Sequence, residues 1–368
     1  MMASLFRLKT LVIKELLSYL RDPRTRLILI GPPLIQLLVF SFAVTLDVKN
    51  VDIAVLNLDS GQHGARFVEH LDAAAFTHEL IMVQSGAALE ALIDTRKVLL
   101  GLSVPVDFSR KINNADTVGL QLLLDGRRAN AAQVSSSYVA SVASLYNRQL
   151  VPDRRYAGAV VRHWFNPNLL YTWFIVPSLS GVLALLIAML ITALSIARER
   201  ELGTFEQLLV SPISASEIII GKSLPAVLIG TVLGVVMVLA GVLIFRIPFT
   251  GSSLLLAITL PLFILSSVGI GLSISAISKT QQQAILGAFA IIVPVVLTSG
   301  FATPVENMPQ WLQVISSANP LRWYLVIIQG LFLKSLPVND VLQNLLPLFY
   351  IAFVSLVAAV LIVRRKLE

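Results

Sequence analysis

Long stretches without charged side chains alternate with short charged segments along most of this 368-residue chain. No Asp, Glu, Lys or Arg occurs in residues 27–46, 163–197, 223–245, 247–278, 280–305 or 341–363. A helix needs roughly 20 apolar residues to cross a bilayer, and each stretch is long enough. A helix of a soluble core would instead carry a polar face at every turn. The pattern therefore predicts six transmembrane helices.

The composition agrees with a membrane protein. Hydrophobic residues make up 56% of the chain and charged residues 13%, with a mean hydropathy of +0.81. An ordinary soluble domain carries about 25% charged residues. The first 26 residues are basic, but no short apolar region with a small-residue cleavage site follows them. We therefore expect no removable signal peptide.

The basic residues of the short connecting segments predict the orientation. Thirteen of them fall in residues 1–26, in residues 198–222, at Lys279 and in the C-terminal tail, whereas three fall in the segments between. Because cytoplasmic loops are enriched in Lys and Arg, both termini and the 198–221 loop are expected in the cytoplasm. The net charge of +7 thus reflects membrane topology, and the basic residues form no stripe of the kind that binds nucleic acid.

Residues 1–26 are predicted to form an amphipathic helix in the cytoplasmic interface. Arg7, Lys9 and Lys14 lie apart from a set of apolar residues near helical spacing, which are Leu5, Leu8, Leu11, Val12, Leu16 and Leu20. Two interpretations remain open here, a plain membrane-entry helix and a helix that also braces a partner. The first span follows in residues 27–46, and two prolines near its start predict a kink.

Residues 47–171 differ in composition from the apolar stretches, because charged and turn residues occur throughout. Strands are predicted at 52–59, 79–83, 98–104 and 118–125, and helices at 62–75, 86–97 and 127–150. Alternating strands and helices indicate an α/β domain with a mixed sheet. The fold class is thus an α-helical membrane protein of six transmembrane helices, with an extracytoplasmic α/β domain inserted between the first and second. Because the chain contains no cysteine, this domain depends on its own core.

Few residues of the outer domain indicate a metal-binding or catalytic site. Its histidines, His63, His70, His78 and His163, match no zinc-binding spacing, so no metal site is expected. A Gly-x-Ser-x-Gly elbow is absent, which argues against an extracellular hydrolase. The turn at residues 125–128 (DGRR) suits either an exposed anion-binding turn or a plain strand end, and the second is favoured.

Within the predicted spans the informative feature is the absence of ionisable groups. A proton- or sodium-coupled transporter usually needs one facing its pathway. Residues 216–223 (SEIIIGKS) end like a phosphate-binding loop, but they lack its leading glycine and follow no strand. Lys222 is therefore interpreted as an anchor that reaches toward the membrane surface. The chain is expected to hold no ATPase site and no cofactor of its own, so its energy must come from another protein.

The loop 198–221 is the place where such a protein would bind. Gly203 and Thr204 are expected to end the helix of the second span, and Thr204 to cap a short new helix that Pro212 ends. That helix would present a hydrophobic knob flanked by carboxylates. The residues expected to couple to the partner are Arg198, Glu199, Glu201, Gly203, Thr204, Phe205, Glu206, Leu208, Leu209 and Pro212.

Three segments resemble a known family. ARERELGTFEQLLVSP (residues 197–212), followed by EIIIGKSLP, resembles the signature of the type 2 ATP-binding cassette exporter permeases, whose equivalent loop carries the coupling helix. GFATPVENMPQWLQVISSANPLRW (residues 300–323) is similar to the family's stretch between the fifth and sixth spans, and RHWFNPN (residues 162–168) to the entry of its second span. The resemblance covers the whole chain and includes the large outer domain of the multidrug-type subgroup.

The resemblance implies a half-transporter in the bacterial inner membrane. Its partners would be a separate ABC ATPase that binds ATP and magnesium, a second permease subunit, identical or paralogous, and membrane lipid. Residues 172–368 would form a five-helix transmembrane region, with a re-entrant outer segment at 300–323. That segment would act as an outer gate through Gly300, Pro304, Glu306, Pro309 and Trp311. The mouth of the path would be lined by Asn166, Asn168, Tyr171 and Trp173, the last two of which also suit an aromatic belt at the membrane surface.

The uncharged spans favour a hydrophobic or amphipathic cargo taken from the cytoplasm or the inner leaflet. Two other functions stay open. A secondary transporter would require an ionisable group within the membrane, and a sensor or assembly scaffold would use the outer domain but leave the charged loop unexplained.

Overall fold

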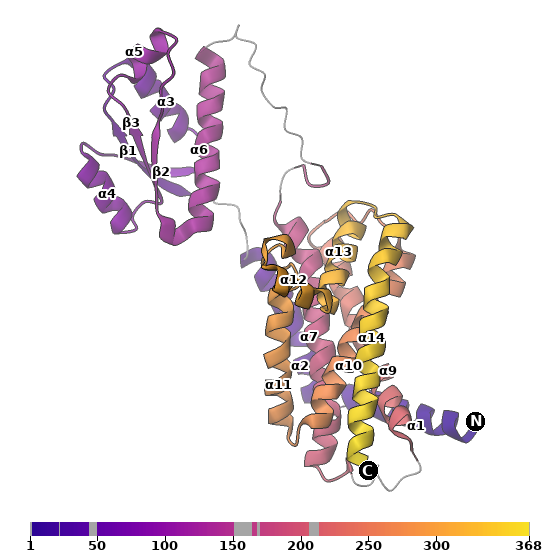
Figure 1. Ribbon diagram of the computed structural model, residues 1–368. Coiled ribbons are helices and arrows are strands. Elements are labelled where there is room, and N and C mark those ends of the chain that lie inside the picture. The colour runs from indigo at the N-terminus through magenta and orange to yellow at the C-terminus, as the bar shows by residue number, and fades with distance from the viewer. Residues whose placement is uncertain are drawn as a thin grey trace. The chain divides into compact units, whose positions relative to one another are not determined.

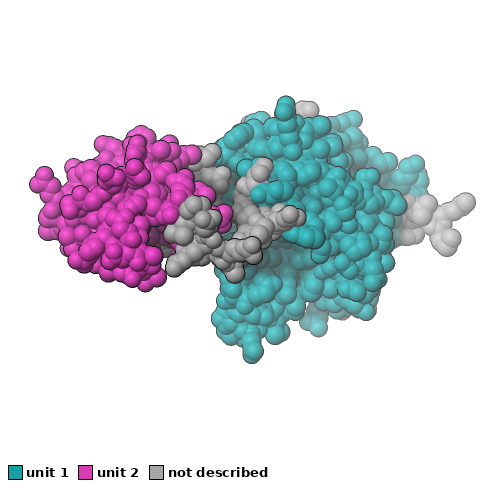
Figure 2. Space-filling model, turned by 90° about the horizontal axis from the view of Figure 1, so that it is seen from above, with its two compact units in different colours: residues 1–44, 163–368 teal, residues 45–162 magenta. Residues whose placement is uncertain are grey.

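The computed structural model of the chain describes residues 2–21, 23–43, 50–150, 164–167, 170–205 and 213–367. The chain divides into two compact units, one made of Met1–Val44 and His163–Glu368 and the other of Thr45–Arg162 (Figure 2). The first unit is helical, and the second contains the sheet. The predicted boundary of the outer domain at residue 171 therefore lies beyond the end of the second unit.

The second unit is a mixed four-stranded sheet with helices on both faces (Figure 1). Strand β1 lies between β2 and β3 and is parallel to both, whereas β4 is antiparallel to β3. The elements are β1 (Val51–Asn57), α3 (Gln62–Asp72), β2 (Thr77–Met82), α4 (Gly86–Asp94), β3 (Leu100–Val104), α5 (Phe108–Asn113), β4 (Gln121–Leu124), η1 (Gly126–Arg128) and α6 (Ala129–Leu150). Each predicted strand and helix has a counterpart, and α5 is an addition that the sequence pattern did not indicate.

Alternate residues of β1 face two separate clusters of apolar side chains. Ile53 and Val55 pack with residues of α3 and α6, such as Phe67, while Ala54 lies on the opposite face with Leu89 of α4. These side chains are at most 1% exposed. The β-strand period of two therefore places one core on each face of the sheet.

In the DGRR turn, the side chain of Arg127 forms hydrogen bonds within the chain. Arg127 Nε donates to Asp125 Oδ1 at 2.7 Å, and its Nη2 donates to the carbonyl oxygen of Ile93 at 2.7 Å. The hydrogen bond from Arg127 holds the pKa of Asp125 below its usual range, although desolvation opposes that shift. Because the guanidinium is used in this way, the structure favours the strand-end interpretation over an anion-binding turn.

The helical unit is formed from both ends of the chain (Figure 1). The N-terminal pair is α1 (Met2–Arg21) and α2 (Pro23–Ala43). The remainder are α7 (Thr172–Glu201), α9 (Ala215–Leu243), α10 (Ser253–Ile277), α11 (Gln281–Leu297), η2 (Val305–Asn307), α12 (Gln310–Ser317), α13 (Pro320–Leu333) and α14 (Val338–Leu367).

In the described parts of the chain, four helices are long and apolar enough to cross a membrane, namely α7, α9, α10 and α14. The other two predicted spans correspond to shorter apolar helices, Gly31–Phe42 within α2 and the 17-residue α11. At 1.5 Å per residue α11 extends about 26 Å, slightly less than a hydrocarbon core of about 30 Å. The count of six spans therefore stays a prediction. A further apolar helix, α13, lies where none was expected.

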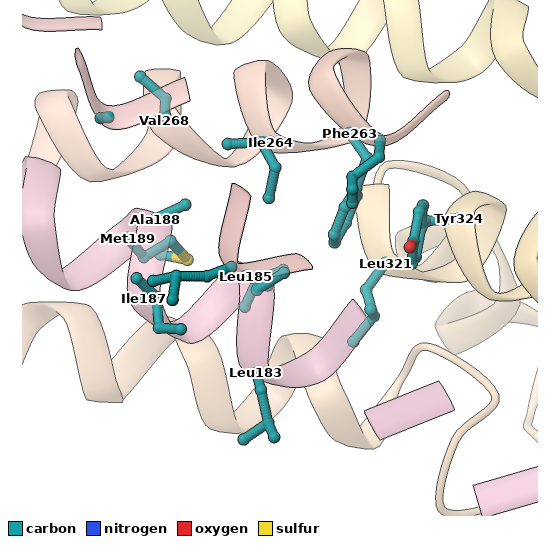
Figure 3. Packing of buried hydrophobic residues seen from close by; sticks show 14 of the residues in the cluster. Leu183, Leu185, Ile187, Ala188, Met189, Phe263, Ile264, Val268, Leu321 and Tyr324 are labelled. Atoms are coloured by element: carbon teal, nitrogen blue, oxygen red, sulfur yellow. The ribbon is translucent and has the colours of Figure 1, made fainter. Parts of the chain in front are cut away.

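Helix α7 is the central element of the helical unit, because α2, α9, α10, α11 and α13 all pack against it. Leu185 and Met189 of α7 lie beside the buried residues of α10 and α13, among which the rings of Phe263 and Tyr324 stack 4.1 Å apart (Figure 3). At Gly271 of α10 a Cβ atom would collide with Thr192 Oγ1 of α7. Small residues of this kind let transmembrane helices approach closely.

Three helices connect α11 to α14, namely η2, α12 and α13, and a buried turn joins the last two. Asn319 caps α13 by accepting a hydrogen bond from the amide of Leu321, and its own amide donates to the carbonyl oxygen of Val295 at 2.6 Å. Ser316 at the end of α12 donates to the carbonyl oxygen of Thr298. The chain thus returns to the end of α11 before α13 packs against α7, α10 and α14.

Candidate coupling site

The cytoplasmic loop predicted from the sequence begins where α7 ends, and a glycine makes that end sharp. Gly203 has φ +72°, the left-handed conformation that favours glycine. The amide of Gly203 donates to the carbonyl oxygen of Arg200, and the amide of Thr204 donates to that of Glu199 at 2.9 Å. This pair of bonds is the Schellman arrangement of a helix end. Gly203 and Thr204 therefore end the helix, as the sequence predicted.

The last residues of α7 reach the turn between α10 and α11. Arg200 Nη1 donates to the carbonyl oxygens of Ala276 at 3.1 Å and Ser278 at 2.6 Å, at the end of α10. Glu201 Oε2 accepts a hydrogen bond of 2.7 Å from the amide of Gln281, the first residue of α11. A cation at a helix C-terminus and an anion at an N-terminus both complement the helix dipole. These contacts fasten the end of α7 to two neighbouring helices.

Glu199 joins two more helices to the same point. Its Oε1 lies 2.8 Å from Lys14 Nζ of α1, and its Oε2 forms an ion pair of 2.9 Å with Lys222 Nζ of α9. Burial alone would lower the pKa of Lys14, but its hydrogen bond to Glu199 and the charge of that carboxylate outweigh burial, so the pKa of Lys14 is raised. Residues 199–201 therefore contact four helices, α1, α9, α10 and α11.

Two interpretations of the sequence are corrected here. Glu199 was expected to flank a knob that faces a partner, but it is only 8% exposed and binds within the chain. Lys222 was interpreted as an anchor near the membrane surface, but its side chain is 0% exposed and lies 2.8 Å from Glu15 Oε1. In both cases an opposite charge on a distant helix partners the buried charge, which offsets part of its desolvation cost.

The loop ends at α9, which begins with a capping box. Ser214 Oγ accepts from the amide of Glu217, and Glu217 Oε2 accepts from the amide of Ser214 at 2.8 Å. Glu217 Oε1 also accepts from Arg7 Nη2 of α1 at 3.2 Å. A reciprocal pair of this kind satisfies two backbone donors at the helix start.

The other predicted coupling residues divide into three groups. Arg198 and Thr204 are partly exposed. Phe205 was expected to be part of an exposed hydrophobic knob, but it is 6% exposed and lies under Arg200, whose Cζ is 5.0 Å from the ring centroid. A cation over an aromatic face is attracted by the ring electrons, which explains the inward position. The remaining predicted residues lie outside the described part of the chain, namely Glu206, Leu208, Leu209 and Pro212.

The predicted outer-gate residues lie in one connected segment that runs from the end of α11 into α12. Gly300 has φ +92° and turns the chain just after α11. Pro304 precedes η2, Glu306 lies within it, and Pro309 immediately precedes α12. Trp311 on α12 is 65% exposed. A shallow cavity of about 480 Å³ lies beside this segment and is lined by Gln310, Gln313, Val314, Ser317 and Arg322.

The predicted path residues are placed less distinctly. The side-chain amide of Asn166 closes a local turn, since it donates to the carbonyl oxygen of Leu170 and accepts from the amide of the same residue. Tyr171 and Trp173 are partly buried against the core of the helical unit. Asn168 lies outside the described residues. Tyr171 and Trp173 therefore lie at the start of α7, whereas the side chain of Asn166 is used within its own turn.

The sequence pattern did not indicate three residues of the site, namely Glu15, Ser195 and Gln281. Glu15 had a signal, because it lies four residues after Leu11 and four before Tyr19, on one face of α1. A carboxylate between two residues of an apolar face predicts a buried partner. The role of Gln281 depends on its backbone amide alone, which the residue type does not reveal.

Among the described residues, no group of three or more His, Asp or Glu side chains is placed to hold a metal ion. The site is instead an arrangement of ion pairs and helix caps. It can transmit a displacement of the loop to several helices, because residues 199–201 contact four of them.

Comparisons with known proteins point to one family. The model of the family described as "ABC-2 family transporter protein" matches residues 24–361. The probable multidrug ABC transporter permease YbhR of Escherichia coli strain K12 is 43% identical over 364 residues, which cover 98% of this chain and 99% of YbhR. The probable multidrug ABC transporter permease YbhS of the same strain is 28% identical, over 89% of this chain and 88% of YbhS. The inner membrane transport permease YhhJ is 26% identical, over 96% of both chains.

Proposed function

The chain belongs to the ABC-2 family of transporter proteins, and from that premise we propose that it is the permease subunit of an exporter driven by a separate ATPase. The observation that carries this proposal is the linkage of residues 199–201 to four helices. A protein that displaced the adjoining residues 204–212 would move all four helices at once. The chain itself needs no nucleotide site for this role.

Transport then results from repeated displacement of the loop by the ATPase. The partner ATPase binds ATP and magnesium, and its closure pushes the loop, which shifts the end of α7. Because α7 is central and tightly packed, its shift moves α10 and α13 with it. Interfaces packed in this way switch between discrete arrangements. A second permease subunit, identical or paralogous, would complete the path across the membrane.

The membrane arrangement is part of the proposal. Both termini and the loop 198–221 face the cytoplasm of a bacterial cell, the chain crosses the inner membrane six times, and residues 47–171 lie outside. In this arrangement α2 and α11 cross with α7, α9, α10 and α14. The outer segment 300–323 gates the exit of the path. Its mouth is lined by Asn166, Asn168, Tyr171 and Trp173, of which the last two also suit the membrane surface.

We propose a hydrophobic or amphipathic cargo that enters from the cytoplasm or the inner leaflet. The predicted spans carry no charge along most of their length, so a highly charged cargo would find few matching groups. Two relatives carry names that describe them as probable multidrug permeases, which supports the same class of cargo. Membrane lipid would surround the spans.

The alternative function is a membrane sensor or an assembly scaffold that uses the outer unit. It accounts for the sheet of residues 51–124. It gives no reason for a transporter family match over residues 24–361 or for the linked charges at the end of α7. We therefore prefer the exporter.

Loss of the loop is expected to abolish binding of the ATPase. Deletion of residues 204–210, or Glu206→Lys, should reduce co-purification of the ATPase by about tenfold or more, which corresponds to roughly 1.4 kcal/mol of binding energy. The chain should still insert in the membrane, because the contacts of residues 199–201 with α1, α9, α10 and α11 remain. The measurement is affinity capture of the tagged chain from cells that express both proteins.

Glu90→Lys provides a matched control for the charge reversal. Glu90 lies on α4 of the other unit and is exposed. Capture of the ATPase should be unchanged in this variant. If the deletion variant captured as much ATPase as the unaltered chain, binding would have to occur elsewhere and the proposal would fail.

A further inference from the structure

Helix α1 is tied to both ends of the loop 198–221. Lys14 of α1 pairs with Glu199 at the start of the loop, at 2.8 Å, and Arg7 of α1 pairs with Glu217 at its end, at 3.2 Å. Seven residues of helix separate Arg7 from Lys14, a length of about 10 Å. One rigid helix thus spans the distance between the two ends of the loop.

A buried lysine lies at the centre of this arrangement. Lys222 Nζ of α9 is 2.8 Å from Glu15 Oε1 of α1 and 2.9 Å from Glu199 Oε2 of α7, and it donates to Ser195 Oγ at 3.1 Å. The side chains of Lys222, Glu15 and Glu199 are 0%, 9% and 11% exposed. With Lys14 they form a set of two cations and two anions, which we call the four-charge latch.

The two faces of α1 differ in what they contact. Leu11, Glu15 and Tyr19 form the buried face, and Leu11 packs directly on Gly221 of α9. The opposite side of the helix exposes apolar residues, which are Phe6, Ile13, Leu17 and Leu20. Helix α1 lies at the end of the helical unit where α14 also ends, and it runs across the direction of the long helices (Figure 1). Among the described residues, the buried face of α1 packs on α9, and the latch adds the charged contacts that make α1 follow the loop.

Separation of α1 from α9 would leave charges of the latch buried without partners. A buried charge that loses its partner is strongly unfavourable, far more so than an exposed ion pair that opens to water. The latch is therefore expected to stay closed while the loop moves. Any displacement of α9 then carries α1 and the end of α7 with it.

We propose that Lys222 is a positioning residue for ATP-driven export, which acts by holding α1, α7 and α9 together as one body through the four-charge latch. The inference rests on the proposed function and deepens it, because it assigns the transmission of movement to residues that do not touch the ATPase. Without the latch, a push on the loop is no longer carried to α1. ATP is then hydrolysed with little export.

The first test replaces the lysine. In vesicles that contain the chain with its ATPase, Lys222→Met should leave ATPase binding and ATP hydrolysis within about twofold of the unaltered complex, and should lower the cargo exported per ATP by about tenfold. If Lys222→Met alone does not fold, the double variant Lys222→Met with Glu15→Gln should fold, because it also removes the charge of the carboxylate that has lost its partner. Lys9→Met is the control, since Lys9 is an exposed cation on the same helix.

The second test replaces the latch by a covalent bond. The chain contains no cysteine, so no native thiol of the chain competes with an introduced pair. A Cβ atom at Gly221 would lie 3.3 Å from Cβ of Leu11, near the separation of about 3.5–4.5 Å found in disulfides. Leu11→Cys with Gly221→Cys should therefore form a disulfide on oxidation. A chain with this bond and an intact latch should export normally.

Rescue separates a positioning role from a purely structural one. In the Lys222→Met background, oxidation of the cysteine pair should restore export per ATP, and a reductant should abolish it again. The inference is overturned if Lys222→Met exports the normal amount per ATP, or if the disulfide blocks export when the latch is intact. If the unaltered complex fails to export cargo with ATP, the proposed function fails instead, so the two failures are distinguishable.

Discussion

Arg200→Ala is expected to lower ATP-driven export at least about tenfold while the chain still inserts in the membrane. The guanidinium donates to the carbonyl oxygens of Ala276 and Ser278 and covers the ring of Phe205. A hydrogen bond that involves a charged group contributes roughly 1.5–3 kcal/mol, so its loss is enough for such an effect. The variant frees the end of α7 from α10 and leaves the carbonyl oxygens of that turn without their donor.

The measurement is cargo export by vesicles that contain the chain and its ATPase, with ATP hydrolysis followed in parallel. Arg200→Lys should have an intermediate effect, because lysine keeps the charge but lacks the planar fork. Lys279→Ala removes one positive charge from the neighbouring turn, where the Lys279 side chain is exposed, and should leave export unchanged. Normal export by Arg200→Ala would contradict the role given to residues 199–201.

Gly271→Val is expected to reduce the amount of folded chain in the membrane to less than about a tenth. A Cβ atom at this position would collide with Thr192 Oγ1 and lie 3.0 Å from the carbonyl oxygen of Met189, which belongs to the backbone of α7 and cannot turn away. Overpacking costs about 1–3 kcal/mol, and more where backbone is in the way. Losses of that size change the abundance of a protein several-fold in cells.

Gly31→Val is the matched control on another apolar helix. The nearest atom to a Cβ at Gly31 is Leu27 Cδ1, at 3.9 Å, so the added side chain meets no close neighbour. The measurement is the amount of monodisperse protein extracted from membranes with detergent. An equal yield from both variants would mean that α7 and α10 do not approach as closely as described.

The hydrophobic pattern predicted most of the helical unit because membrane burial depends on long apolar runs. The runs 163–197, 247–278 and 341–363 contain most of α7, α10 and α14. Helix α13 was missed because Arg322 lies in its first turn and Lys334 follows its end, which leaves a charge-free run too short for a span. Its burial instead comes from contacts with α7, α10 and α14.

The end of α7 was predicted from the sequence, but the buried positions of Glu199 and Phe205 were not. The end of α7 at Gly203 follows from local backbone chemistry, which the sequence carries. The inward positions of Glu199 and Phe205 depend on Lys222, Lys14 and Arg200. Such partners lie up to 185 residues away in the chain, and a single sequence does not pair them.

The central claim is that a separate ATPase drives this chain from its cytoplasmic end. The most direct measurement is the uptake of a lipophilic dye by inside-out vesicles that contain the chain with its ATPase. Uptake should require ATP and should disappear when the ATPase is absent or carries a substitution that prevents hydrolysis. If vesicles with the chain alone accumulated the dye, or if uptake followed an ion gradient without ATP, the account would be contradicted.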